Sequence, residues 1–296
     1  MRIAIDGTLV EPGHAHVSVL DHGLLYGDGI FEGMRVYHGR LFRLEDHLAR
    51  LAIGASALGL TLPGGLDAVR RTVLATCAAH GKPDAYVRLV VTRGEGPLGV
   101  DPTDCGPGRT ICIVGDIALH SDATRARGVA VITSSHRRPP PDVLDPRIKS
   151  LNYLNNVQAK REARMRGADE ALLLNARGLV AEAAVANVFA VRGGRLVTPP
   201  ATEGALEGIT RRTVLELSRE LGIAAAEQPM GRLDLLGADE AFLTGSGAGI
   251  VPIASLDGVQ IGTGDRPVTR AILQAFDACT RRGTTGDGPI AYDAVS

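Results

Sequence analysis

The sequence has no tryptophan, and aromatic residues make up only 3% of its 296 residues. Its four cysteines form no CxxC pair and show no histidine and cysteine spacing of a metal site, which favours a reducing compartment and no metal centre. No uncharged apolar run approaches bilayer length, and the first residues lack the features of a signal peptide. We therefore expect a cytoplasmic protein without a membrane-spanning segment.

The chain also lacks an excess of charge of either sign, because its formal net charge is only −1. Such a chain has no basic field for the phosphates of nucleic acids and no polybasic face for an anionic membrane. Nucleic acid and membranes are therefore not expected as partners. The 45% of hydrophobic residues can fill the core of one large domain or of two ordinary ones.

The apolar patterns divide the chain into two unequal α/β halves. We predict a small N-terminal domain over residues 1–116, a linker over 117–128, a larger C-terminal domain over 129–282 and a disordered tail over 283–296. Helical periodicity predicts helices near residues 44–58, 66–79, 152–167, 210–221 and 267–282. The proline-rich stretch 139–147 is predicted not to be helical.

Glycine-rich stretches do not match the motifs of common nucleotide sites or hydrolases. GDGIFEG is not GxGxxG, so its glycines (Gly27, Gly29, Gly33) are expected to serve tight turns. GSGAG over 245–249 lacks the first glycine of a nucleophile elbow, which disfavours a serine hydrolase. Its unhindered N–H groups and the Ser246 hydroxyl could instead hold an anion.

A second possible anion site is the start of the helix near residue 210. Gly208, Ile209 and Thr210 stand where N–H groups and the helix dipole favour phosphate, although Thr210 could equally be an ordinary N-cap. Two such sites suggest a phosphorylated ligand.

Several charged residues stand in largely apolar surroundings. Tyr86 and Arg88 share one face of a predicted strand, and Arg35 and Arg50 likewise call for an anion, whether a ligand or an internal acid. Lys149, in IKSLNYLNNV, could reach water along its stem, or its desolvated amine could attack an aldehyde cofactor. Glu182 could then keep a pyridine nitrogen protonated, or could simply be a surface carboxylate.

Seven segments carry a resemblance to one family along nearly the whole chain: SVLDHGLLYGDGIFEGMRVY, HLARL, YVRLVVTRGEGPLGV, IKSLNYLNNV, NVFAV, LEGITRR and FLTGSGAGIVPI. In this order and spacing the sequence resembles the class IV, or fold-type IV, aminotransferases that depend on pyridoxal 5′-phosphate (PLP). YVRLVVTRG and FEGMRVY look most like the branched-chain amino-acid aminotransferases. The chain departs from that subfamily in the residues that follow Glu182 and in GSGAG.

The resemblance implies a fold and a set of site residues. The fold would be the two-domain, mixed α/β fold of D-amino-acid aminotransferase, and Lys149 would form the internal aldimine with PLP. Tyr153 and Glu182 would contact the pyridine ring. The phosphate would be held by Arg50, Ile209, Thr210 and Ser246. The substrate would lie among Tyr26, Phe31, Arg35, Tyr86 and Arg88, with its carboxylate at the N–H groups of Gly247 and Ala248.

The implied reaction moves an amino group between a branched-chain or similar apolar L-amino acid and 2-oxoglutarate through the Lys149 aldimine. The implied assembly is a homodimer in which the partner's N-terminal half walls part of each active site. Alternatives within the fold are a D-amino-acid aminotransferase, an R-selective amine transaminase and an aminodeoxychorismate lyase. A phosphate-ligand binding protein without catalysis is an alternative from another class.

Overall fold

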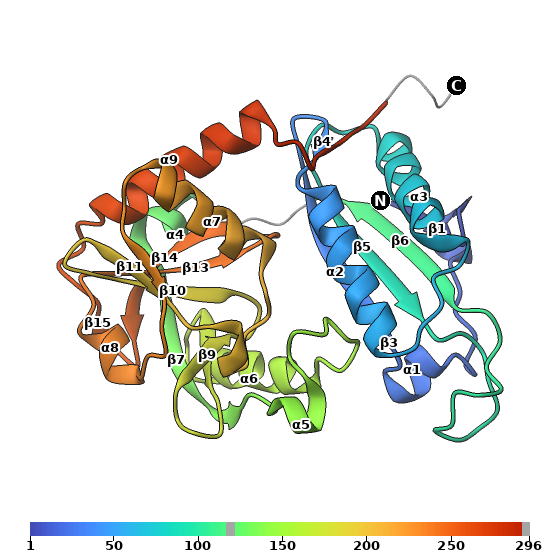
Figure 1. Cartoon of the computed structure of the whole chain (residues 1–296), viewed down its shortest axis with the longest axis horizontal. Helices are drawn as coiled ribbons and strands as arrows, with labels where there is room; N and C mark the ends of the chain where they lie inside the picture. Colours follow the sequence, from blue (N-terminus) through green and yellow to red (C-terminus); the bar gives the residue numbers. More distant parts are fainter. Residues whose placement is uncertain (117–121, 292–296) are drawn as a thin grey trace. The chain divides into compact units, whose positions relative to one another are not determined.

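The computed structural model describes residues 1–116 and 122–291, which fall into two compact units (Figure 1). Unit 1 holds the described parts of Met1–Ala118, Ile148–Asn152 and Cys279–Ser296. Unit 2 holds the described parts of Leu119–Arg147 and Tyr153–Ala278. Each unit is built on a sheet, so the predicted mixed α/β class is confirmed.

Unit 1 contains an antiparallel sheet with the strand order β16-β4-β3-β5-β6-β1-β2. Its strands are β1 (Arg2–Ile5), β2 (Thr8–Val10), β3 (Gly29–Tyr37), β4 (Arg40–Leu41), β5 (Ala85–Thr92), β6 (Arg109–Gly115) and β16 (Gly288–Pro289). Its helices are α1 (His22–Tyr26), α2 (Leu44–Ala57) and α3 (Gly65–His80), with a 3-10 turn at Pro12–His14.

Helices α2 and α3 cover one face of this sheet (Figure 1). Side chains alternate along β5, so Val87, Leu89 and Val91 enter the core with Leu48 and Leu51 of α2. The side chains between them, including those of Tyr86 and Arg88, lie on the opposite face. The helices therefore bury one face of the sheet and leave the other for polar residues.

Unit 2 contains a mixed sheet with the order β12-β11-β10-β13-β14-β7-β8-β9, and β15 pairs with β14. Its strands are β7 (Val129–Arg137), β8 (Glu170–Leu174), β9 (Val180–Ala183), β10 (Asn187–Arg192), β11 (Arg195–Thr198), β12 (Ala225–Glu227), β13 (Glu240–Gly245), β14 (Gly249–Leu256) and β15 (Val259–Gln260). Its helical segments are α4 (Asp122–Arg127), α5 (Pro141–Leu144), α6 (Leu154–Met165), a 3-10 turn (Ala201–Glu203), α7 (Ile209–Glu220), α8 (Arg232–Leu236) and α9 (Pro267–Arg282), whose last residues count with unit 1.

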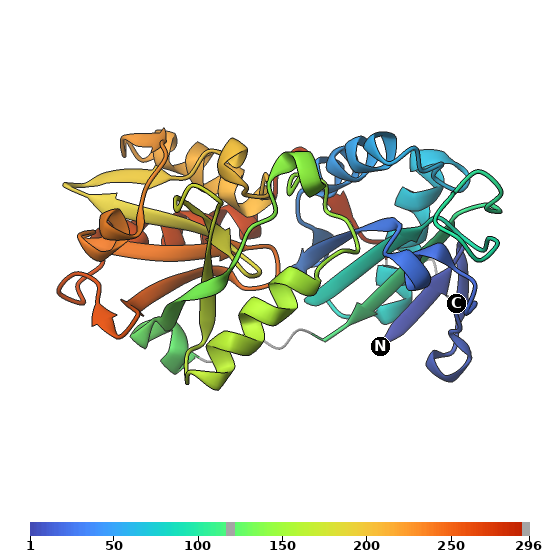
Figure 2. The same ribbon diagram turned by 90° about the horizontal axis from the view of Figure 1, so that it is seen from below.

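Helix α6 packs on β7 and β8 (Figure 2). Ala159 and Ala163 of α6 are fully buried against Ala171 and Leu173 of β8. Alanine has no side-chain entropy to lose, so it suits a close contact between helix and sheet. The packing of α6 therefore fixes the point at which the preceding segment, residues 148–153, enters the helix.

The five predicted helices are found as α2, α3, α6, α7 and α9, with ends within a few residues of those expected. The prediction that residues 139–147 are not helical was wrong, because Pro141–Leu144 form one turn of helix. Pro141 takes the first helical position, where its missing N–H costs no hydrogen bond and its fixed φ suits the helix.

The predicted linker and tail also differ from the structure where it describes them. Residues 122–127 form helix α4, and 117–121 lie outside the described residues. In the expected tail, Gly288 and Pro289 pair with Leu41 and Arg40 of β4, while 292–296 lie outside the described residues. Ile290 joins the core of unit 1, so burial of apolar surface offsets the entropy of ordering this segment.

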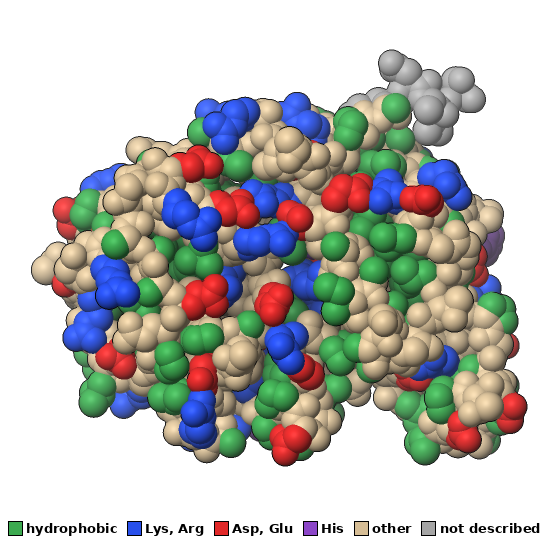
Figure 3. Space-filling model, in the orientation of Figure 1, with side chains coloured by type: hydrophobic (Ala, Val, Ile, Leu, Met, Phe, Trp, Pro, Cys, Tyr) green, Lys and Arg blue, Asp and Glu red, His purple; other side chains and the backbone are tan. Residues whose placement is uncertain are grey.

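No described helix has the length and apolar character needed to cross a bilayer. On the face drawn in Figure 3, lysine and arginine side chains are interspersed with aspartate and glutamate. This face carries no extended field of one sign, in keeping with the net charge of −1.

Candidate active site

The segment that carries Lys149 lies along the edge of β3 as a short extra strand. The N–H of Phe31 donates to the carbonyl of Lys149 at 2.9 Å, and the N–H of Leu151 donates to the carbonyl of Gly29 at 2.9 Å. Within β3, only Val36 and Tyr37 pair with β4, so this segment satisfies groups at the other end of β3. Lys149 is thus fixed in unit 1 by backbone hydrogen bonds.

Glycine at position 29 makes this close approach possible. A Cβ atom there would lie 2.6 Å from both Leu151 Cδ1 and the carbonyl oxygen of Val91. Only Gly27, in the left-handed conformation at the end of α1, is a turn glycine as predicted. The same prediction was wrong for Gly29 and Gly33, which lie inside β3.

The amine of Lys149 lies over an aromatic ring, with Nζ 4.6 Å from the centroid of Phe31. The guanidinium of Arg88 lies 4.5 Å from the same centroid and donates through Nη2 to the Tyr86 hydroxyl at 3.1 Å. Phe31 and Arg88 come from the neighbouring strands β3 and β5. An amine, a guanidinium and a phenol are therefore grouped around one ring.

Arg35 and Gly33 complete this face of the sheet. Arg35 pairs with Tyr86 across the strands, and its guanidinium lies 4.4 Å above the ring of Tyr37. A Cβ atom at Gly33 would lie 2.3 Å from the Tyr86 hydroxyl, so the glycine makes room for that side chain. The structure thus brings together five predicted site residues: Phe31, Arg35, Tyr86, Arg88 and Lys149.

On the other face of β3, Arg50 belongs to a buried charged cluster. Its Nε and Nη2 donate to the two carboxylate oxygens of Glu32 at 2.8 and 2.7 Å, and His47 Nδ1 lies 2.8 Å from Glu32 Oε2. The side chains of Glu32 and His47 are only 1% and 2% exposed. Because a carboxylate only accepts, Nδ1 of His47 carries the proton. Glu32 uses two of the five N–H donors of Arg50 and fixes its orientation.

The electrostatics of this cluster depend on burial. Burial lowers the pKa of the His47 imidazole below its ordinary value despite the neighbouring carboxylate. For Glu32, burial alone would raise the pKa, but the Arg50 guanidinium and the His47 donor outweigh it and hold the pKa well below its usual range. Sequence reasoning missed Glu32 and His47, although an acid inside a buried strand and a histidine three residues before Arg50 were available signals.

We expect the free energy of unfolding to decrease as the pH falls below about 6.5, the ordinary pKa of histidine. In the unfolded chain His47 then binds a proton, whereas buried His47 in the folded protein stays neutral because its pKa is lowered. The free energy of unfolding therefore falls by up to about 1.4 kcal/mol per pH unit. Below about 4.5, protonation of Glu32 in the unfolded state adds a second loss.

Urea unfolding at pH 7.5, 6.5 and 5.5 measures this slope. His47→Asn should flatten it, whereas exposed His14→Asn should leave it unchanged. His80 also has a lowered pKa, so the difference between variant and wild type is the informative quantity. Equal slopes in wild type and His47→Asn would contradict the assignment.

Tyr26 lies elsewhere in unit 1, at the end of α1. Its hydroxyl accepts the N–H of Gly99 at 2.8 Å, and its side chain is partly exposed. Among the described contacts of unit 1, none joins Tyr26 to the ring of Phe31.

In unit 2, Glu182 is buried, which rules out the surface position considered for it. Its Oε1 lies 2.8 Å from Nη2 of buried Arg138, and its Oε2 accepts from Asn187 Nδ2 and from the N–H of Leu206, both at 3.0 Å. Three donors match the acceptor-only, ionised form of a carboxylate. Arg138 and Asn187 were not predicted, since nothing in the sequence shows that they converge on Glu182.

The start of α7 has an open set of N–H groups. Gly208, not Thr210, is the N-cap, and no side chain caps the helix. Ile209 and Thr210 are the first two helical residues and are buried. A Cβ atom at Gly208 would lie 2.0 Å from Asn187 Oδ1, so the amide that binds Glu182 also requires this glycine. An uncapped and buried helix start is a suitable place for an anion.

The remaining predicted residues lie at the ends of other elements. Ser246, Gly247 and Ala248 form the turn between β13 and β14 and are half-buried. Tyr153 is the N-cap residue of α6 and follows the Lys149 segment directly in the chain. Because Tyr153 follows Lys149 by only four positions, the length of the intervening chain limits how far apart the two residues can lie.

The model of the family described as amino-transferase class IV matches residues 29–256, so the chain belongs to that family and is an aminotransferase. It is most similar to the branched-chain enzymes among those compared. A Methanocaldococcus jannaschii protein, provisionally named a branched-chain-amino-acid aminotransferase, is 46% identical over 260 residues, 87% of this chain and 88% of that relative. The D-alanine aminotransferase of Bacillus licheniformis is 33% identical over 281 residues, 93% of this chain and 96% of that relative.

Solved structures agree with this assignment and confirm the fold-type IV architecture. The branched-chain amino acid aminotransferase of Escherichia coli superposes with a TM-score of 0.90 at 32% identity and covers 94% of both chains. That of Thermoproteus uzoniensis, solved with norvaline, gives a TM-score of 0.89 at 34% identity and covers 95% of both chains. A third branched-chain amino acid aminotransferase, complexed with N-(5′-phosphopyridoxyl)-L-glutamate, gives a TM-score of 0.89 at 33% identity and covers 95% of this chain and 94% of its own.

Proposed function

We propose that this aminotransferase depends on PLP and moves amino groups between a branched-chain or similar apolar L-amino acid and 2-oxoglutarate, with Lys149 bonded covalently to the cofactor. The observation that carries the proposal is the position of Lys149. Its backbone is hydrogen-bonded into β3, and its amine lies over Phe31 beside Arg88. A lysine held in this way presents its amine in one place, as covalent catalysis requires.

The residues present suit the phosphate of PLP. The uncapped start of α7 offers the N–H groups of Ile209 and Thr210 and the Thr210 hydroxyl, and Ser246 offers a second hydroxyl. We propose that these groups and Arg50 hold the phosphate. Glu32 already fixes Arg50, so little side-chain entropy would be lost when the phosphate binds.

Glu182 and Tyr153 are proposed to hold the ring. PLP, when bound, supplies an aldehyde that condenses with amines and a ring that stabilises the charge left when a proton leaves the substrate carbon. The ionised carboxylate of Glu182 would keep the proton on the ring nitrogen, and Arg138 and Asn187 hold that carboxylate in place. The Tyr153 side chain would contact the ring.

Lys149 also has a role as a base in the proposal. Once the amino acid has displaced it, the Nζ of Lys149 would take the proton from the substrate carbon and return it to the cofactor. The nearby cation of Arg88 and the ring of Phe31 restrict where that amine can move. The second half of the reaction, with an oxo acid as acceptor, would use the same groups in reverse.

The face of the unit 1 sheet that carries Phe31, Tyr86 and Arg88 suits both substrates. Phe31 and the ring of Tyr86 offer apolar surface to a branched side chain, while Arg35 or Arg88 would bind the second carboxylate of 2-oxoglutarate. The N–H groups of Gly247 and Ala248 are proposed to receive the carboxylate common to both substrates. The relative solved with a phosphopyridoxyl derivative of L-glutamate supports a dicarboxylate substrate.

The test is an assay of the purified protein with PLP and 2-oxoglutarate as amino acceptor. We expect L-leucine to be converted at least about a hundredfold more efficiently than D-alanine, because one arrangement of carboxylate and side-chain pockets accepts one enantiomer. The similarity to a D-alanine aminotransferase makes the D-amino-acid reaction the second candidate. Faster turnover of D-alanine would establish that candidate and contradict the L-specific proposal.

The proposed homodimer finds support in an exposed apolar patch of unit 1. The patch consists of Val19, Leu20, Leu24, Leu25, Tyr26, Leu98 and Val100. Leu98 and Val100 are 79% and 81% exposed. Hydrogen bonds join the two segments that carry these residues, from the N–H of Gly96 to the carbonyl of Leu20 and from the N–H of Gly99 to the Tyr26 hydroxyl. Exposed apolar side chains on adjoining segments favour an interface, and a second copy is the commonest partner.

We expect the wild type to have twice the chain mass of 30.9 kDa by light scattering. Leu98→Asp combined with Val100→Asp should yield the single-chain mass, because two charges cannot be buried in an apolar interface without partners. Val143→Asp, also at an exposed valine but in unit 2, should leave the mass unchanged. A dimer that survives the double substitution would place the interface elsewhere.

A further inference from the structure

We propose that His22 is a positioning residue that fixes Tyr26 and the loop from residue 94 to 106 relative to each other, and so determines how tightly the side chain of the amino acid is bound. The inference rests on the proposed function and on the contact between Tyr26 and the substrate that the resemblance implies, in a homodimer where the N-terminal half of one chain walls the active site of its partner. His22 is the buried residue of the short helix α1, with 1% of its surface exposed. It is not among the residues assigned to substrate or cofactor.

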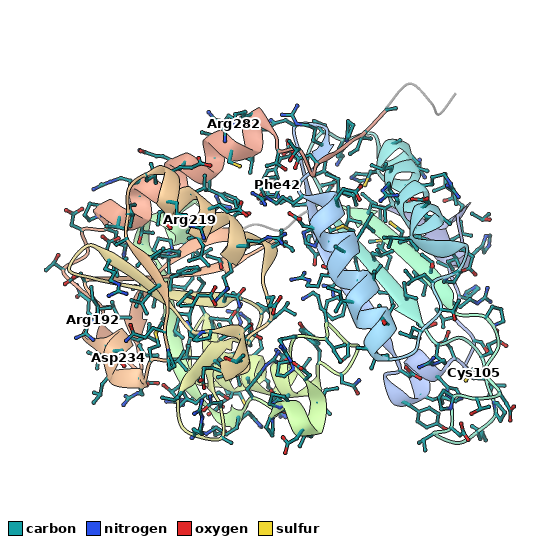
Figure 4. The ribbon with its side chains drawn as sticks, viewed as in Figure 1. Phe42, Cys105, Arg192, Arg219, Asp234 and Arg282 are labelled. Atoms are coloured by element: carbon teal, nitrogen blue, oxygen red, sulfur yellow. The ribbon has the colours of Figure 1, made fainter. Side chains whose placement is uncertain are left out.

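The imidazole of His22 joins two points of the loop. Its Nε2 lies 3.0 Å from the carbonyl oxygen of Pro97. A carbonyl oxygen only accepts, so Nε2 carries a proton and donates it to Pro97. The Sγ atom of Cys105 lies 3.4 Å from Nδ1, a second contact between the ring and the loop. Cys105 lies beside α1 at this end of unit 1 (Figure 4).

The same ring supports Tyr26. The two rings meet edge to face, with centroids 4.8 Å apart and planes at 81°. The far end of Tyr26 is held by the loop, because its hydroxyl accepts the N–H of Gly99. Pro97, Gly99 and Cys105 belong to one loop. His22 and Tyr26 contact each other and both contact this loop, so these contacts together fix the position of the Tyr26 side chain relative to the loop.

Gly96 shows how tightly the loop packs on His22. A Cβ atom there would lie 2.6 Å from Cys105 Sγ and 2.7 Å from His22 Nε2. The backbone at Gly96 has an ordinary φ, so alanine would cause no strain of its own and would act by displacing these two side chains.

Backbone hydrogen bonds keep the two segments together without the imidazole. The N–H of His22 donates to the carbonyl of Gly94, and the N–H of Gly96 donates to the carbonyl of Leu20. Loss of the His22 side chain should therefore loosen Tyr26 and the loop while unit 1 remains folded. The expected consequence is weaker binding of large side chains, with the chemical step unchanged.

The experiment compares His22→Ala, Gly96→Ala and the exposed control His14→Ala in the full-length enzyme with saturating PLP and 2-oxoglutarate. For L-leucine we expect KM to rise about tenfold in the first two variants with kcat within about twofold, the pattern of lost ground-state binding. For L-alanine, whose methyl group reaches less of the pocket, we expect KM to change by less than about threefold. The control should match the wild type for both substrates.

Other outcomes overturn the proposal. Unchanged KM values, or equal losses for L-leucine and L-alanine together with a lower unfolding temperature, would show that His22 only supports the fold. A wild type that converts neither amino acid and gains no visible absorption band with PLP would refute the proposed function itself. Wild-type turnover with an unaffected His22→Ala variant would refute only the role of His22.

Discussion

Replacing Lys149 by alanine is expected to reduce turnover of L-leucine by at least about a thousandfold, because the substitution removes both the proposed covalent attachment and the proposed base. The fold should survive. The hydrogen bond to Phe31 uses the backbone carbonyl of residue 149, which alanine keeps. The start of α7 should still bind the phosphate of PLP in the variant.

Lys82→Ala is the matched control. Lys82 is an exposed lysine of the same unit, paired with exposed Asp116, and its loss should leave turnover within about twofold of wild type. The measurement is the steady-state rate together with the unfolding temperature of each variant. A Lys149→Ala enzyme with more than about a tenth of wild-type activity would contradict the mechanism.

Replacing Glu182 by glutamine is expected to lower kcat by about a hundredfold to a thousandfold. The neutral amide cannot keep a proton on the ring nitrogen, so less charge would be stabilised as the proton leaves the substrate carbon. The substitution also breaks a buried ion pair with Arg138, which typically costs about 3 kcal/mol of stability. The loss of rate must therefore be separated from the loss of stability.

Arg138→Gln makes that separation, because it removes the same ion pair but keeps the carboxylate. We expect the two variants to lose similar stability in urea unfolding, whereas only Glu182→Gln loses most of its kcat at saturating PLP. Asn187 and the N–H of Leu206 still hold Glu182 in the Arg138 variant. Equal kcat values for the two variants would show that Glu182 supports the fold and not the chemistry.

The fold could be predicted well from the sequence because its helices obey local rules. The apolar spacing of residues 44–58 predicts an amphipathic helix, and α2 buries that face. Two α/β halves follow in the same way from alternating strands and helices. The tail could not be predicted, because its order depends on pairing with β4, a strand more than 240 residues earlier in the chain.

The candidate site was predictable only in part. Tyr86 and Arg88 share a strand face because side chains alternate, and sequence alone shows this. The position of Lys149 over Phe31 depends on hydrogen bonds between segments almost 120 residues apart, which no local pattern records. The apolar surroundings drew attention to Lys149 but left its role open, and the resemblance to the family implied the bond to the cofactor.

The supporting residues were missed for the same reason. Glu32 and His47 are bound to Arg50 through contacts between β3 and α2, and Arg138 reaches Glu182 from a different segment of unit 2. Each would be an ordinary charged residue in the sequence. Burial with a partner at hydrogen-bond distance, which only the structure shows, distinguishes them.

The measurement that tests the central claim most directly is chemical trapping of the lysine that bonds to PLP. The chain has three lysines, Lys82, Lys149 and Lys160. The purified protein is incubated with PLP, reduced with borohydride, digested and analysed by mass spectrometry. We predict one phosphopyridoxyl group per chain, on Lys149, and none after L-leucine has been added before reduction. Labelling of Lys82 or Lys160, or no stable label, would contradict the account.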